Sequence, residues 1–132
     1  MSLIYSIGQL SKLTGCKVTT IRYYEEIELL PSPSRSMGNQ RRYNQEHLAR
    51  LQFIRHSRAL GFSLEEVRQL IHLQHCSSHS PHEAHKIAKV HLQDVEKKIK
   101  QLQALQLELT EMVDSCDQGN SYHCNVLDAL ND

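Results

Sequence analysis

The sequence predicts an all-α-dominated protein, in which a helix-turn-helix module is followed by one long helix and a short polar loop. Three observations predict this class. Apolar residues recur every three to four positions through most of the 132 residues, as they do on one face of a helix. Gly15 separates two short helical patterns, and a heptad repeat of apolar residues runs through the rear of the chain. We therefore divide the chain into a helix-turn-helix domain (1–74), a connector (75–80), a long helix (81–115), and a loop with a short terminal helix (116–132).

The helices of the front domain have recognisable start and stop signals. Ser6 is the predicted N-cap of the first helix, and Gly15 ends that helix before a second one follows. Residues 31–39 are rich in Pro, Ser and Gly and are expected to form turn and loop. Asn44 can cap a third helix, and the segment Ser63–Glu66 matches a capping box that opens a fourth.

The long helix begins with two strong signals, because Ser80 is a preferred N-cap and Pro81 suits the first helical position. Its apolar residues are spaced alternately by four and three positions, and polar Gln106 lies on the same track. Such a seam is typical of a coiled coil, and the rest of the chain is too small to cover it. We therefore expect a homodimer that pairs through this helix. The apolar seam consists of Ala88, Leu92, Val95, Ile99, Leu102, Leu109 and Val113.

Charge and composition narrow the class of protein. Residues 1–70 carry ten Lys and Arg against six Asp and Glu, whereas residues 71–132 carry five against nine. Only the front half is therefore expected to approach a polyanion. The sequence contains no stretch as apolar as a membrane span and no signal peptide, so we expect a cytoplasmic protein with reduced thiols and no membrane partner. It also contains no carboxylate pair, nucleophile elbow or phosphate-binding loop, and an enzyme is not expected.

The second helix and the loop after it carry residues that suit double-stranded DNA. In a helix-turn-helix, the second helix is the one that meets the major groove. Arg can reach guanine edges or phosphates, while Tyr hydroxyls more often contact the backbone. Adjacent Tyr23 and Tyr24 cannot share a helix face, so one of them is expected to be core. The candidate DNA-binding residues are Thr20, Arg22, Tyr23, Arg35, Arg41, Arg42 and Tyr43.

Several short motifs together resemble the MerR family of bacterial regulators. The motifs are Ile21-Arg-Tyr-Tyr-Glu-Glu26, Leu29-Leu-Pro31, Gly38-Asn-Gln-Arg-Arg-Tyr43 and Phe62-Ser-Leu-Glu-Glu66. The resemblance extends over essentially the whole chain. It implies a winged helix-turn-helix, an antiparallel coiled-coil dimer, and binding to a promoter whose DNA is then distorted so that RNA polymerase can engage it. It also implies that Arg22 and Tyr23 are helix contacts and that Arg35, Arg41 and Tyr43 are wing contacts.

Cys116 and Cys124 enclose a short polar loop. Two thiolates that close around such a loop can clamp a thiophilic metal ion. The MerR resemblance strengthens this hypothesis, because two Cys that bracket a loop after the dimer helix mark the metal sensors of the family. Cys16 lies in the turn of the helix-turn-helix and is expected to be structural. A short terminal helix is expected at Val126–Leu130.

The identity of the metal is left open by the sequence. Relatives that sense divalent ions take a third Cys from the partner protomer, at a place where this chain has Pro81. In one interpretation, His82 or Cys76 reaches across the dimer and is joined by His123 or Asp117. Imidazole and thiolate ligands suit Zn(II) or a related divalent soft ion. The metal-ligand candidates are then Cys116, Cys124, His82, Cys76 and His123.

In a second interpretation, the two loop cysteines alone hold Cu(I) or Ag(I). The seven-residue gap between Cys116 and Cys124 favours copper, because copper-type relatives have the same gap. The sequence of residues 122–130 resembles the zinc type more closely, so we favour a divalent ion. A thiol redox switch, in which the two cysteines oxidise to a disulfide, is the alternative of another class.

Overall fold

The computed structural model describes residues 3–75, 82–117 and 125–131, apart from the side chains of Cys116, Asp117 and Asn125. It divides into a front unit, residues 1–83, and a rear unit, residues 84–132. Ser80 and Pro81, the predicted start of the long helix, lie outside the described residues, as does Cys76. None of the described helices is both long and apolar enough to span a bilayer.

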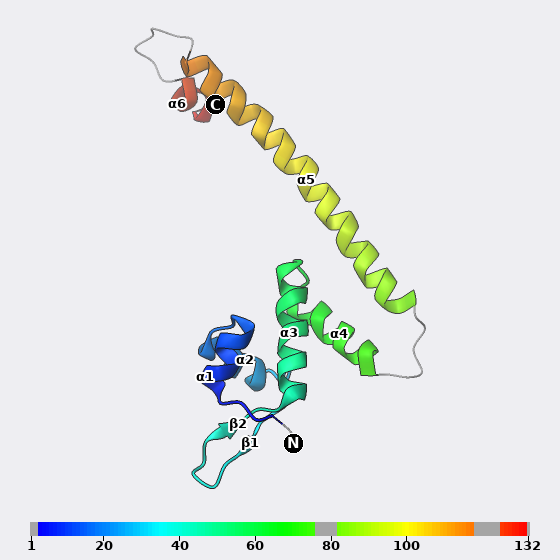
Figure 1. Cartoon of the computed structure of the whole chain (residues 1–132). Helices are drawn as coiled ribbons and strands as arrows, with labels where there is room; N and C mark the ends of the chain where they lie inside the picture. Colours follow the sequence, from blue (N-terminus) through cyan, green and yellow to red (C-terminus); the bar gives the residue numbers. More distant parts are fainter. Residues whose placement is uncertain (1–2, 76–81, 118–124, 132) are drawn as a thin grey trace. The chain divides into compact units, whose positions relative to one another are not determined.

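The front unit contains four helices and a small hairpin (Figure 1). In chain order these are α1 (Ile7–Thr14), α2 (Val18–Glu26), β1 (Ser34–Arg35), β2 (Arg41–Arg42), α3 (Gln45–Ala59) and α4 (Leu64–His75). Helix α1 packs against α2 and α3, and α3 packs against α4. One shared apolar core results, formed by Leu10, Ile21, Tyr24, Leu29, Leu30, Tyr43, Leu51, Ile54, Phe62, Val67, Ile71 and Leu73.

The helix caps predicted for the front unit are confirmed. The Ser6 hydroxyl accepts from the backbone N–H of Gln9 at 3.2 Å, and the Gln9 side chain accepts from the N–H of Ser6 in return. Asn44 caps α3, and Ser63 forms the expected capping box at the start of α4. Gly15 ends α1 with a φ of 76°, in the left-handed region where a side chain is disfavoured. Its conformation turns the chain from α1 into α2.

Residues 34–42 form a wing rather than only turn and loop. Strands β1 and β2 are antiparallel, with Ser34 opposite Arg42 and Arg35 opposite Arg41. A further bridge joins Tyr43 to Tyr5, through backbone hydrogen bonds of 2.7 and 2.9 Å. The N-terminal segment thus pairs with the base of the wing, and the winged helix-turn-helix implied by the family resemblance is confirmed.

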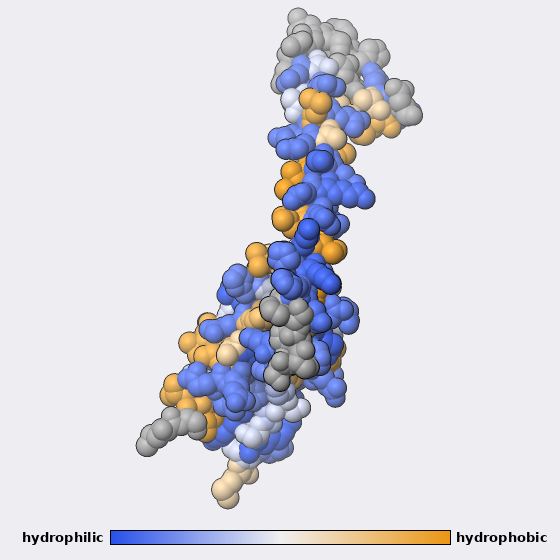
Figure 2. Space-filling view, turned by 90° about the vertical axis from the view of Figure 1, so that its right-hand side faces the viewer, coloured by the Kyte–Doolittle hydropathy of each residue, from blue (hydrophilic) through white to orange (hydrophobic). Residues whose placement is uncertain are grey.

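The rear unit contains the long helix α5 (His82–Asp117) from Ala84 onward and the short helix α6 (Asn125–Leu130). Both helices agree with the sequence prediction. Apolar side chains of the seam lie at the surface of α5, and Figure 2 shows hydrophobic patches along it. The exposed seam residues are Leu92, Ile99, Leu102, Leu109 and Val113.

Candidate functional site

Helix α2 presents two neighbouring side chains to solvent while it buries two others. Ile21 and Tyr24 are buried, whereas Arg22 and Tyr23 are exposed. The prediction that one of the adjacent tyrosines is core is therefore confirmed, and Tyr24 is the core residue. Thr20 is partly exposed on the same helix. An exposed Arg and Tyr on the second helix of a helix-turn-helix are placed to meet the edge of a DNA groove.

Three arginines from three separate elements line one hollow in the surface. Arg22 comes from α2, Arg35 from β1 and Arg41 from β2. Guanidinium groups that converge in this way suit a phosphate, because their planar donors match its oxygens. Arg42, on the other side of the strand from Arg41, is exposed. The hollow is completed by Ser6, Ile7, Asn39 and Gln40.

The wing tip is shaped to keep Arg35 beside this hollow. Asn39 adopts a φ of 64° at the turn, a conformation that Asn tolerates better than most residues. Its carbonyl accepts a hydrogen bond from Nη1 of Arg35 at 3.1 Å. The Ser36 N–H donates to the Gln40 carbonyl at 2.8 Å and closes the hairpin. Arg35 is thus held along the wing, with guanidinium donors left for a phosphate.

Tyr43 corrects one sequence-based expectation. The family motif that contains Tyr43 implies a contact with DNA. In the structure, the side chain of Tyr43 is fully buried, and its hydroxyl donates to the carboxylate of Glu25 on α2. Burial, with the carboxylate of Glu25 close by, raises the pKa of Tyr43 above its ordinary value, so the hydroxyl keeps its proton. Tyr43 supports the wing from inside. Glu25 is a residue of this surface that the sequence reasoning missed.

Other arginines of the front unit hold backbone carbonyls instead of facing the hollow. Nη2 of Arg68 donates to the carbonyl of Ile27 at 2.7 Å, and Nη1 of Arg50 donates to that of Leu29 at 3.3 Å. Both carbonyls follow the end of α2, where helix carbonyls lack partners in their own helix. These two arginines therefore help to fix the chain at the end of α2.

The predicted metal ligands fall mainly outside the described residues. Cys124, His123 and Cys76 lie outside them, and Cys116 is described only as backbone in the last turn of α5. His82 is exposed at the first position of α5. Among the side chains that the structure does describe, no three His, Cys, Asp or Glu come together to hold a metal. The assembly of these ligands thus stays a prediction.

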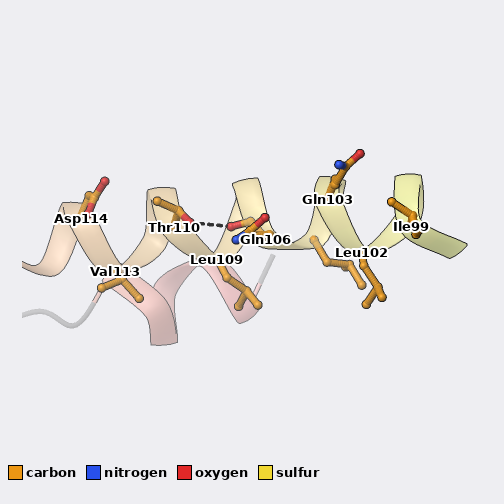
Figure 3. Close-up of a pocket in the computed structure, with 9 residues that line it drawn as sticks. Ile99, Leu102, Gln103, Gln106, Leu109, Thr110, Val113 and Asp114 are labelled. Carbon is orange, nitrogen blue, oxygen red and sulfur yellow. Dashed lines mark hydrogen bonds between the residues drawn. The ribbon is translucent and has the colours of Figure 1, made fainter.

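The rear part of α5, on the way to Cys116, has an apolar side and a polar side. Leu102, Leu109 and Val113 project from one side of the helix, and Gln103, Thr110 and Asp114 project from another (Figure 3). The Thr110 hydroxyl donates a hydrogen bond to the backbone carbonyl of Gln106 at 2.7 Å. The apolar side agrees with the predicted heptad seam.

Comparison with known proteins identifies the family. The chain matches the model described as "MerR HTH family regulatory protein" over residues 5–74 and the model described as "MerR, DNA binding" over residues 48–112. It is 52% identical over 71 residues to the HTH-type transcriptional regulator ZntR homolog of Haemophilus influenzae. That match covers 54% of this chain and 53% of the relative, so it spans about half of that relative's length.

Two further relatives match over nearly the whole chain. The probable heavy metal-dependent transcriptional regulator of Haemophilus influenzae is 36% identical over 126 residues, which is 96% of this chain and 98% of that protein. The crystal structure of the transcription regulator PbrR691 from Ralstonia metallidurans CH34, in complex with lead(II), has a TM-score of 0.79 and 41% identity, covering 96% of this chain and 98% of that one. The chain therefore belongs to the MerR family of helix-turn-helix regulators, which are DNA-binding transcription factors and not enzymes.

Proposed function

We propose that this chain is a metal-responsive transcription regulator that binds promoter DNA as a homodimer. The observation that carries the proposal is the hollow lined by Arg22, Arg35 and Arg41, which joins the second helix of the helix-turn-helix to the wing. Phosphate contacts of this kind position a protein on the duplex. Exposed Tyr23 and Arg42 and partly exposed Thr20 then lie on the elements nearest to the DNA.

The homodimer forms through α5 as an antiparallel coiled coil. The exposed apolar seam of α5 supports this part of the proposal, since such a surface is stable in water only when a second surface covers it. Each dimer would carry two front units, and an operator with two related half-sites would match this symmetry. RNA polymerase acts at the same promoter.

The sensed metal is Zn(II) or a related divalent soft ion, bound through Cys116 and Cys124. The choice of a thiophilic metal rests on the chemistry of the two thiolates and on relatives named for heavy metal or solved with lead(II). His82 or Cys76 of the other protomer, with His123, would complete a site of sulfur and nitrogen ligands. Cu(I) held by Cys116 and Cys124 alone is the second candidate, because the seven-residue gap favours it.

The response rests on the segment between α5 and α6. Ligation of Cys116 and Cys124 would fix that segment and so change the position of α6 relative to α5. We infer that this change alters the angle between the two front units and thereby the distortion of the promoter. DNA that is distorted equally by the metal-free and the metal-loaded protein would rule out this mechanism.

One experiment tests which metal the protein binds and through which ligands. The fully reduced protein is titrated with Zn(II) and separately with Cu(I), each against a competing chelator. Zinc binding that is tight and is weakened by His82→Ala or Cys76→Ser would support the divalent site across the dimer. Cu(I) binding that survives both substitutions, with zinc held only loosely, would support the copper alternative.

Two controls separate the other classes. A redox switch responds to peroxide without metal, whereas a metal sensor responds to metal under full reduction. The substitutions Arg22→Ala and Arg41→Ala should abolish DNA binding and leave metal affinity unchanged. Metal binding with no DNA binding in the unsubstituted protein would identify a metal carrier and contradict the regulator.

A further inference from the structure

Glu25 is a carboxylate next to Arg41, one of the arginines that line the hollow. It lies in the last turn of α2, and only 10% of its side chain is exposed. One oxygen accepts from the buried hydroxyl of Tyr43, and the other lies 3.5 Å from Nε of Arg41. Both partners belong to the wing strand β2 or follow it directly. Glu25 is therefore a direct side-chain link between α2 and the wing.

The wing end of this link has little freedom to move. The Tyr43 backbone is paired on both its N–H and its carbonyl with Tyr5. Its ring packs edge-on against His47 at 5.4 Å between ring centroids. His47 is itself tied to the cap of α3, since its Nδ1 lies 3.1 Å from the N–H of Asn44. The Tyr43 hydroxyl is thus fixed in space, and Glu25 meets a rigid anchor.

A negative charge at this place opposes DNA binding by simple electrostatics, because it repels phosphates. Glu26, the next residue on α2, carries the same charge but is exposed. Glu25 differs because its carboxylate interacts with side chains of the protein itself. It balances the guanidinium of Arg41 through Nε, and the guanidinium retains further donors for a phosphate.

We propose that Glu25 is a positioning residue that makes α2 and the wing act as one DNA-reading unit. It holds Arg41 at the hollow that Arg22 enters from α2, so that both arginines meet the duplex at a fixed separation. This inference rests on the proposed function only in that the surface of α2 and the wing binds DNA.

The test compares Glu25→Gln with the matched control Glu26→Gln, which removes the same charge from the same helix. The probes are the duplex that the unsubstituted protein enriches from a random-sequence pool and an unrelated duplex of equal length. Glu26→Gln should bind both duplexes as tightly as the unsubstituted protein, or more tightly. Glu25→Gln should lose about tenfold in affinity for the enriched duplex, since it removes a charge-assisted contact, and should keep its affinity for the unrelated duplex.

A second readout reports on position rather than on affinity. Hydroxyl-radical footprints of Glu25→Gln should lose protection at the outer positions, where the wing lies, and keep protection in the major groove segment read by α2. Tyr43→Phe removes only the hydroxyl that donates to Glu25 and should give the same footprint. The losses from Glu25→Gln and Tyr43→Phe should not add in the double variant, because both break one link.

Three outcomes would overturn the inference. Equal behaviour of Glu25→Gln and Glu26→Gln would show that only charge matters. Loss of folding in both Glu25→Gln and Tyr43→Phe, seen by circular dichroism and thermal unfolding, would make Glu25 a core residue without a positioning role. Full additivity of the two losses would show that they are independent. Failure of the unsubstituted protein to enrich any duplex would instead contradict the proposed function itself.

Discussion

Replacing Leu102 with alanine should weaken the homodimer far more than the same change at Leu107. Both side chains are exposed in the single chain, Leu102 to 64% and Leu107 to 63%. Leu102 belongs to the heptad seam, whereas Leu107 lies away from it on the same helix. Alanine favours the helix at least as well as leucine, so neither change weakens α5 itself.

The size of the effect follows from the area that pairing would cover. Leu→Ala removes about three carbon groups, each contributing about 0.8 kcal/mol when buried. Because 64% of the Leu102 side chain is exposed before pairing, the loss is about 1.5 kcal/mol for each protomer. A symmetric dimer contains the substitution twice, which gives about 3 kcal/mol and raises the dimer Kd by roughly 100-fold.

Sedimentation equilibrium over a range of protein concentrations measures this Kd directly. Leu107→Ala should change it by less than about threefold, because that side chain stays exposed in the dimer. If the two substitutions weaken the dimer equally, the seam is not the pairing surface. If neither does, α5 does not mediate the association.

Three further predictions concern the front unit, and each is measured by chemical or thermal unfolding. Gly15→Ala should lower the free energy of unfolding by about 1–2 kcal/mol, since its φ is 76°. Gly8→Ala, in the first turn of α1 where an added methyl group has space, should raise it by up to about 1 kcal/mol, and an equal effect of the two would contradict the argument. Ser63→Ala should lower it by about 1 kcal/mol through the lost cap of α4, and an unchanged value would show that the cap contributes nothing. Burial raises the pKa of Tyr43, so the stability that its protonated hydroxyl contributes is complete below the unfolded pKa near 10 and is lost as the pH rises above that value. Above that pH, the free energy of unfolding of the unsubstituted protein should fall by about 1.4 kcal/mol per pH unit more than that of Tyr43→Phe. Parallel curves for the two proteins would refute the assignment.

Local chemistry explains which parts of the fold the sequence predicts well. The caps at Ser6, Asn44 and Ser63 use partners three residues away, so a short window of sequence contains the whole interaction. The wing is different. Its strands have two residues each, too few for an alternating pattern, and its base pairs with Tyr5 far back in the chain. Residue patterns alone therefore predict a loop, and only the family resemblance supplies the wing.

The same contrast holds for the candidate site. Exposure of Arg22 and burial of Tyr24 follow from helical periodicity, whereas the pairing of Glu25 with Tyr43 joins residues 18 positions apart. One signal for it is present in the sequence, since Glu25 follows Arg22 by three positions and so shares its helix face. A carboxylate beside an arginine on a recognition helix indicates a possible partner within the protein. That this partner is Tyr43 is seen only in the three-dimensional structure.

The wing also has an exposed strand edge, and its composition limits what can pair there. Among the described residues, β1 pairs with β2 alone, so its other edge is open. Open edges recruit strands from other polypeptides and lead to aggregation, which short strands, proline and charge all suppress. β1 has two residues, Pro33 stands directly before it, and Arg35 is one of its members. The arginine proposed to meet a phosphate thus also keeps an exposed hairpin from assembling with its neighbours.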